Sequence, residues 1–143
     1  MVIPDVNVLV YALREDAVYH ASALGWLIEQ LSVPRGEVVI PDLVWVGVAR
    51  ICTNPRVFPH PSTIAEVANF FEDVVSQPTC RNVPGLAFGV APLLTLMAQA
   101  DARGNAVTDA YIAAIALQLG ATVCTYDRDF RRFDGLAIVT PAG

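Results

Sequence analysis

The sequence predicts an α/β fold in which a mainly parallel central sheet is covered by helices on both faces. Short apolar runs of strand character alternate with longer segments of helical period along the 143 residues. This order is typical of parallel sheets built from strand–helix–strand units. Asp5 and Asp127 each follow an apolar run, and Asp109 opens an apolar helix. Because ligand sites of open α/β sheets form beyond the carboxyl ends of the strands, the fold class indicates where to look for function.

Five short runs rich in valine, isoleucine and other strand formers are expected to form the sheet. Turn residues bound most of them, such as Pro34-Arg35-Gly36 before the second run. The expected strands are residues 2–6, 37–40, 80–83, 121–126 and 137–140.

The helices are predicted from apolar residues spaced as on one helix face, most clearly within 20–32. Pro41 suits the first turn of a helix, Ser62 is the expected cap of another, and Gly120 suits a helix C-terminus. The expected helices are residues 7–14, 20–32, 41–53, 62–76, 88–102, 108–119 and a short one at 129–133.

Bulk composition favours one globular domain spanning residues 1–143. The chain is 55% apolar and 16% charged, which argues against disorder. Its apolar stretches are too short or too interrupted for a membrane span, and the start at Met1 leaves no room for a signal peptide. Three cysteines without a C-x-x-C pair indicate a reduced compartment, so a cytoplasmic protein is expected.

The charge pattern supports two interpretations of nucleic-acid binding. A net charge of −5 argues weakly against it. However, all nine basic residues are arginine, whose planar fork suits phosphates, so a local arginine rim could bind RNA. A genome biased toward arginine codons explains the same composition equally well.

Each candidate carboxylate also has a purely structural explanation. Either Asp5 or Asn7 could cap the first helix, and either Asp127 or Asp129 could cap the short helix after the strand. Asp109 could be a favourable anion in the first turn of its helix. Together they indicate more, because residues 111–119 form a helix that is apolar on nearly every face and therefore buried. Carboxylates gathered beside it repel one another. A divalent cation such as Mg²⁺, which prefers oxygen ligands, removes that repulsion.

Other enzyme and signalling classes fit less well. Phosphatases with an aspartyl nucleophile and response-regulator receivers add a lysine to the phosphate site, and this chain has none. His20 and His60 lack a supporting serine or cysteine motif for a hydrolytic triad, and no glycine-rich phosphate loop is present.

Four segments in a fixed order carry a family resemblance that spans the chain. They read PDVNVLVYA at 4–12, ARICTNPRVF at 49–58, TDAYIAAIA at 108–116 and TYDRDF at 125–130. Together they resemble PIN-domain ribonucleases of the VapC toxin type, most closely the mycobacterial branch. The resemblance implies an α/β/α PIN fold, a Mg²⁺- or Mn²⁺-dependent endoribonuclease acting on tRNA or ribosomal RNA, and a VapB-type antitoxin.

By motif match, the resemblance also assigns residue roles. Asp5, Asp109 and Asp127 would be the catalytic, metal-coordinating acids, with Asp129 as an outer member. The supporting polar residues that orient these acids would be Asn7, Thr108 and Thr125.

One position departs from the family pattern. Many PIN nucleases have a glutamate three residues before the motif arginine, Arg50, whereas this chain has Gly47. Asp42 lies about 140° away around an ideal helix and cannot replace it. The alternative function is therefore a non-catalytic PIN-fold module that binds RNA or antitoxin.

Two further expectations concern contacts. Arg50, Arg56 and Arg128 are candidates for contacts with RNA phosphates, as are Arg131 and Arg132. The high apolar fraction suggests exposed apolar surface and hence a homodimer.

Overall fold

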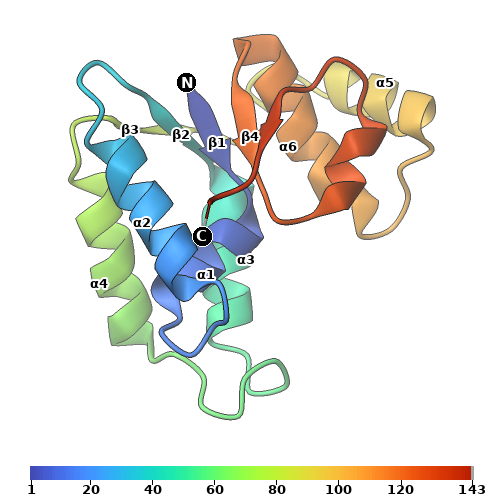
Figure 1. Ribbon diagram of the computed structural model, residues 1–143. Helices are drawn as coiled ribbons and strands as arrows, with labels where there is room; N and C mark the ends of the chain where they lie inside the picture. The colour runs from blue at the N-terminus through green and yellow to red at the C-terminus, as the bar shows by residue number, and fades with distance from the viewer. Residues whose placement is uncertain (143) are drawn as a thin grey trace.

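A five-stranded, fully parallel sheet organises the computed structural model, which describes residues 1–142 (Figure 1). The strand order is β3-β2-β1-β4-β5, so the chain builds one half of the sheet outward from β1 and then crosses back to build the other. The strands are β1 (Val2–Pro4), β2 (Val38–Pro41), β3 (Cys80–Val83), β4 (Thr122–Cys124) and β5 (Ile138–Val139). The predicted α/β class is confirmed.

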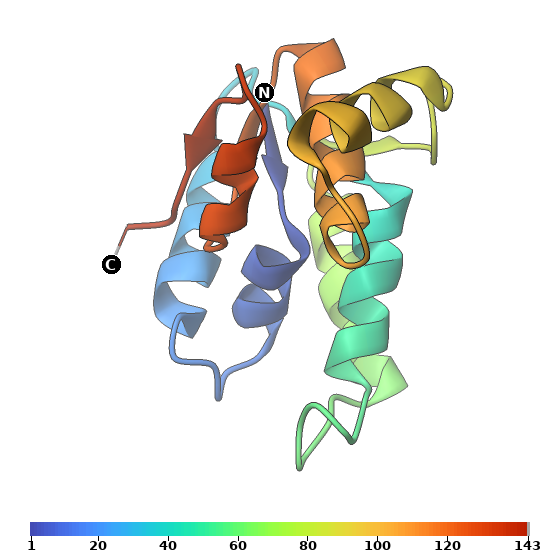
Figure 2. The ribbon, with the colours of Figure 1, turned by 90° about the vertical axis from the view of Figure 1, so that its right-hand side faces the viewer.

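Within residues 1–142, six α-helices and one short 3-10 helix pack around the sheet. Figure 1 shows α1 to α4 to the left of and below β1, and α5, α6 and η1 to its right; Figure 2 gives the view turned by 90°. The helices are α1 (Val6–Leu13), α2 (His20–Leu31), α3 (Asp42–Cys52), α4 (Ile64–Val75), α5 (Ala91–Ala100), α6 (Ala106–Leu119) and η1 (Arg128–Arg132). None of the helices in residues 1–142 is both long enough and apolar enough to span a bilayer.

The core lies where central strands meet helices that are apolar on several faces. Every residue of β2 is buried, as expected for a central parallel strand covered on both sides. In α6 the run from Ala110 to Ala116 is buried throughout, which agrees with the prediction of an enclosed helix. The packed core therefore begins directly after the first turn of α6, which carries Asp109.

Several element boundaries differ from the prediction for local reasons. The first strand ends at Pro4 and not at residue 6, because Asp5 caps α1 and accepts a hydrogen bond from the Val6 amide. Similarly, β4 covers only residues 122–124 of the expected 121–126. The helix expected from residue 88 begins at 91, and the one expected from 108 begins at 106.

The predicted cap of α4 was wrong by one residue. Thr63, not Ser62, is the N-cap, and it forms a reciprocal capping box with Glu66. Ser62 instead turns inward, where its hydroxyl accepts a hydrogen bond from Arg14. The prediction for Gly120 is confirmed: it ends α6 with a φ of 64°, in the left-handed region that glycine adopts without strain.

Candidate metal centre and its surroundings

Asp5 is a buried carboxylate held by donors from both sides. It is only 5% exposed. Its Oδ1 accepts a 2.7 Å hydrogen bond from the Val6 amide, and its Oδ2 accepts bonds from Asn7 Nδ2 at 2.9 Å and Thr125 Oγ1 at 2.8 Å. Burial raises the pKa of Asp5, and the bonds from Thr125 and Val6 partly offset that effect. The three hydrogen-bond donors thus favour the ionised form of the Asp5 carboxyl, whereas its burial favours the protonated form.

Strand register explains why Asp5 and Thr125 meet. Pro4 pairs with Cys124 across β1 and β4, and the Asp5 amide donates to the Cys124 carbonyl at 2.8 Å. The residues that follow the two strands are therefore neighbours. Thr125 Oγ1 also accepts hydrogen bonds from the Asp127 amide at 2.9 Å and from Asn7 Nδ2 at 3.3 Å. The structure thus brings Asn7 and Thr125 to Asp5.

Asp127 and Asp129 lie on the exposed rim of this site. Asp127 is the N-cap of η1, and its Oδ1 accepts a 2.8 Å hydrogen bond from the Asp129 amide. The structural explanation of Asp127 as a cap is therefore correct. It does not exclude a second role, because the other carboxylate oxygen makes no hydrogen bond within residues 1–142.

The pKa of Asp109 is affected by the negative charges of the other acids. It lies half-buried in the first turn of α6. Burial raises its pKa to about 7, together with the negative charges of Asp5, Asp127 and Asp129, while Arg132 acts in the opposite direction. Such a shift in a carboxyl group at the mouth of a parallel sheet marks a functional-site candidate. The sheet and α6 therefore gather four acids around one region.

These acids do not form a closed cage of ligands. Within residues 1–142, no group of three His, Cys, Asp or Glu side chains is arranged closely enough to hold an ion. The donor set still fits Mg²⁺, which commonly keeps several waters and binds through only one or two carboxylates. Asp5 and Asp109 offer a buried and a half-buried carboxylate, and Asp127 offers a third at the rim.

Thr108 does not join Asp5 and Thr125. It is exposed and makes no side-chain hydrogen bond within the described part of the chain. Thr108 instead lines a cavity of about 430 Å³ with Asp42, Leu43 and Tyr111, between the starts of α3 and α6.

Gly47 faces the start of α1. A Cβ added to this buried glycine would lie 3.0 Å from Cγ2 of Val6, the residue after Asp5. Asp42, at the start of α3, accepts a hydrogen bond from the Gly85 amide. Position 47 is therefore beside the acidic site, whereas Asp42 is engaged elsewhere.

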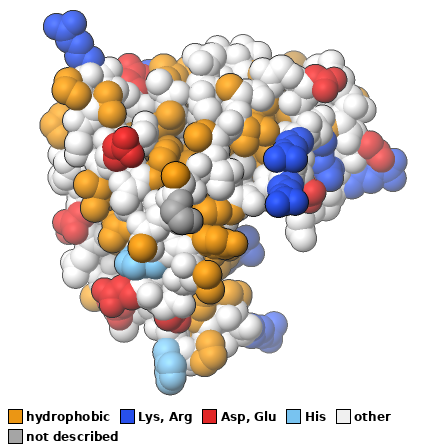
Figure 3. Space-filling view, in the orientation of Figure 1, with side chains coloured by type: hydrophobic (Ala, Val, Ile, Leu, Met, Phe, Trp, Pro, Cys, Tyr) orange, Lys and Arg blue, Asp and Glu red, His pale blue; other side chains and the backbone are white. Residues whose placement is uncertain are grey.

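The candidate RNA-contacting arginines lie on the surface of the protein. Arg50, Arg56 and Arg128 are all exposed, and none makes an ion pair within residues 1–142. Figure 3 shows blue side chains on both sides of a hollow on its right-hand side, and these are arginines because the chain has no lysine. The net negative chain thus carries a local basic rim.

A cluster of tyrosines beside the site was not predicted. The rings of Tyr11, Tyr19 and Tyr126 pack with centroids 4.7 to 5.7 Å apart, and the Tyr126 hydroxyl shares a 2.7 Å hydrogen bond with Ser22. This cluster fixes the segment between β4 and η1 against α1 and α2. The only signal in the sequence was that two of the tyrosines lie in the PDVNVLVYA and TYDRDF segments.

The fold and site place this protein in the class of α/β proteins that gather carboxylates at the carboxyl ends of a parallel sheet. Comparison with known proteins narrows that class. The family model described as "PIN domain" matches residues 2–136. Ribonuclease VapC31 of Mycobacterium tuberculosis is 35% identical over 141 residues, which cover 99% of both chains. The chain therefore belongs to the PIN-domain family and to its VapC-type ribonuclease toxins, as the four segments predicted.

Solved structures agree on the fold. The crystal structure of VapC20 from M. tuberculosis, described as a sarcin-ricin loop cleaving toxin, has a TM-score of 0.73 at 17% identity and covers 99% of this chain and 100% of its own. A chain of the VapBC2 complex from Rickettsia felis, bound to a DNA fragment from its promoter, has a TM-score of 0.69 at 17% identity, with coverage of 99% and 100%. At these identities the likeness establishes the α/β PIN fold alone.

Proposed function

We propose that this chain is a toxin-type endoribonuclease that hydrolyses RNA phosphodiester bonds at the site of Asp5, Asp109 and Asp127. The observation that carries the proposal is the grouping of these acids at the ends of β1 and β4 and in the first turn of α6. Burial there, together with the charges of Asp5, Asp127 and Asp129, raises the pKa of Asp109 to about 7. They would hold Mg²⁺ or Mn²⁺, which when bound supplies Lewis-acid polarisation of a phosphoryl oxygen and a water of lowered pKa.

The chain's own residues prepare the site for that chemistry. The Asp5 carboxylate is oriented by the hydrogen bonds that it accepts from Thr125, Asn7 and the Val6 amide. These bonds also favour its charged form, which is the form that would bind a cation. Asp109 titrates near neutral pH in the metal-free site, so its carboxyl can hold a proton there. Asp129, whose amide is bonded to Asp127, would act from outside the coordination sphere.

The basic rim would position the RNA. Arg50, Arg56 and Arg128 would contact phosphates, which fix the register of a nucleic acid without reading its bases. VapC20, which is described as a sarcin-ricin loop cleaving toxin, supports the proposal by analogy. For this chain we propose a tRNA or ribosomal RNA, which implies action in the cytoplasm.

The first test is cleavage of total bacterial RNA with and without EDTA. Asp5→Asn, Asp109→Asn and Asp127→Asn keep the side-chain shape and remove the charge that would hold the cation. Each should abolish cleavage, with Asp73→Asn on α4 as an exposed control. Full activity of Asp5→Asn, or undiminished cutting in excess EDTA, would contradict the mechanism.

A second candidate function is a PIN-fold module that binds RNA or antitoxin without cutting. Two observations favour it: Gly47 occupies the usual glutamate position, and residues 1–142 contain no closed cage of three ligands. The same RNA assay separates the two functions, because a binding module retains RNA without producing Mg²⁺-dependent fragments.

We further propose a VapB-type antitoxin as partner. The VapBC2 complex provides the precedent. The negative charges around Asp109, which Arg132 offsets only in part, are complementary to a basic side chain inserted from a partner. Co-expression with the neighbouring small open reading frame, followed by co-purification, tests this partner.

A homodimer is the remaining proposed assembly. Large apolar side chains are exposed near the start of α3 and ahead of and on α5, including Leu43, Val46, Leu86 and Leu94. Exposed apolar surface of this kind commonly marks an interaction site. Light scattering across micromolar concentrations tests the dimer, and a monomer throughout would refute it.

A further inference from the structure

The connection between α3 and α4 is an ordered loop, here called the 53–62 loop. Its ends are closed by a 2.8 Å hydrogen bond from the Ser62 amide to the Cys52 carbonyl. Inside it, the Asn54 carbonyl accepts from the amides of Val57 and Phe58, and the Asn54 side chain accepts from the Arg56 amide. A surface loop with close ends and internal bonds of this kind is compact and frequently functional.

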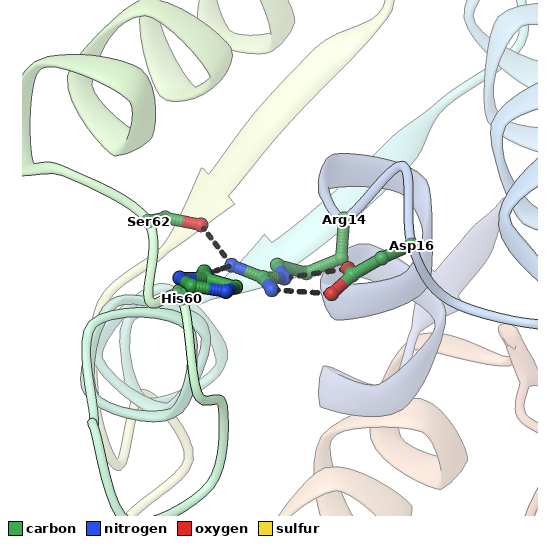
Figure 4. A network of polar contacts seen from close by, with 4 residues as sticks. All are labelled: Arg14, Asp16, His60 and Ser62. Carbon is green, nitrogen blue, oxygen red and sulfur yellow. Dashed lines mark hydrogen bonds and ion pairs between the residues drawn. The ribbon is translucent and has the colours of Figure 1, made fainter.

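The side chain of Arg14 fixes this loop from the other side. Figure 4 shows the guanidinium between Asp16 and the loop. Its Nη1 donates to the His60 carbonyl at 2.8 Å and to Ser62 Oγ at 3.2 Å, while Nε and Nη2 donate to both oxygens of Asp16. Its Cζ also lies 4.0 Å from the ring centroid of Phe58. One side chain thus binds the loop at three residues.

Burial makes this arrangement specific to arginine. The Arg14 side chain is 8% exposed, whereas its partner Asp16 is 60% exposed. A buried cation is costly unless its donors are satisfied, and only the planar fork reaches a carboxylate, a carbonyl and a hydroxyl at once. An apolar side chain would fill the space without fixing the direction of the loop. The network therefore sets the position of the loop as well as its stability.

The same helix joins this network to the acidic site. Asp5 is the N-cap of α1 and Arg14 is its C-cap. The eight residues between them span about 12 Å of rigid helix. In Figure 1 the 53–62 loop lies at the far end of α1 and α3, and in Figure 3 arginines are present on both sides of the adjoining hollow. Arg56, at the exposed part of the loop, is thereby held at a set distance from Asp5.

We propose that Arg14 is a positioning residue: it fixes the 53–62 loop so that Arg56 contacts a phosphate of an RNA strand that extends away from the acidic site. The inference rests on the proposed function. Arg14 itself is buried and contacts no RNA. Arg56 is remote from the acids, so it contributes to binding of the strand and not to the chemical step.

The test measures the salt dependence of RNA binding by the full chain. A fluorescein-labelled single-stranded RNA is titrated in EDTA, which prevents cleavage, with wild type, Arg14→Lys, Arg56→Gln and the double variant. Each phosphate contact contributes about 0.7 to the slope of log K against log salt for single strands. Arg56→Gln should lose about one such contact. Arg14→Lys keeps its charge but should lose the same slope, and the double variant should lose no more than either one.

Matched controls make the outcome specific. Arg35→Gln removes one exposed charge from the turn before β2, and the slope should stay at the wild-type value. In cleavage of total tRNA, Arg14→Lys and Arg56→Gln should raise KM severalfold with kcat unchanged. If Arg14→Lys does not fold, Ser62→Ala removes one of its acceptors without a charge change and should give a smaller loss of slope.

A folded Arg14→Lys with wild-type slope and KM would overturn the inference, as would losses that add in the double variant. Wild type that neither binds nor cleaves RNA would instead overturn the proposed function.

Discussion

Thr125 donates a 2.8 Å hydrogen bond to Oδ2 of Asp5 across 120 positions of sequence. Thr125 is 1% exposed, so water cannot replace this donor. The bond lowers the pKa of Asp5 against the effect of burial. The Thr125 hydroxyl therefore stabilises the carboxyl ends of β1 and β4, and it also favours the charged form of Asp5, the candidate metal ligand.

Thr125→Val removes this hydroxyl at nearly constant shape, and Thr125→Ser retains it. Losing a hydrogen bond to a charged group costs about 1.5–3 kcal/mol, so urea denaturation should show a loss of that order for Val. The pKa of Asp5 should rise further, moving the acid limb of the cleavage profile to higher pH. If Thr125→Val had the same pH profile as wild type, the hydrogen bond from Thr125 would not control the ionisation of Asp5.

Gly47→Glu restores the glutamate that many PIN nucleases have at this position. Because a Cβ at position 47 would lie 3.0 Å from Val6 Cγ2, the single variant should be overpacked by about 1–3 kcal/mol. Up to about 1 kcal/mol of that loss is offset because glycine is a poor helix former. Gly47→Glu with Val6→Ala should recover stability and bind Mg²⁺ more tightly than wild type by calorimetry. A folded double variant without tighter binding would mean that position 47 does not face the metal.

The metal-free protein should lose stability as pH rises from about 4 to 7. The ordinary pKa of an aspartate is 3.8, and that of Asp109 in the fold is about 7. Between these values the folded state binds more protons than the unfolded state, so the unfolding free energy falls with pH. Asp5 acts in the same direction. Unfolding in EDTA should show a smaller fall for Asp109→Asn, and an identical fall would exclude Asp109 as its cause.

Mg²⁺ should raise the melting temperature of wild type at neutral pH. At ten times the dissociation constant, binding to the folded state adds about 1.4 kcal/mol, equivalent to roughly 2–5 °C for a chain of this size. Asp109→Asn and Asp127→Asn should lose this shift, while Asp73→Asn on α4 should keep it. A shift retained in Asp109→Asn would place the cation elsewhere.

The parts of the fold that could be predicted are those with a strong local signal. Asp5 and Asp127 follow apolar runs, so the apolar pattern and the family resemblance predicted that they lie near the carboxyl ends of the strands. The burial of α6 followed from its apolar residues on nearly every face. The contacts of Arg14 could not be predicted, because its partners Phe58, His60 and Ser62 are remote in sequence. Likewise, Ser62 and Thr63 are both good caps, and only the inward turn of Ser62 decides between them.

The pairing of Pro4 with Cys124 also limits which changes of length the chain can tolerate. Side chains alternate between the faces of a strand, so deleting one residue from β4 would turn Thr125 away from Asp5 and move Asp127 along the edge. An insertion at the exposed part of the 53–62 loop would leave that pairing intact. We therefore expect natural length variation among relatives to avoid β1 and β4 and to accumulate in loops that do not set the spacing of the acids.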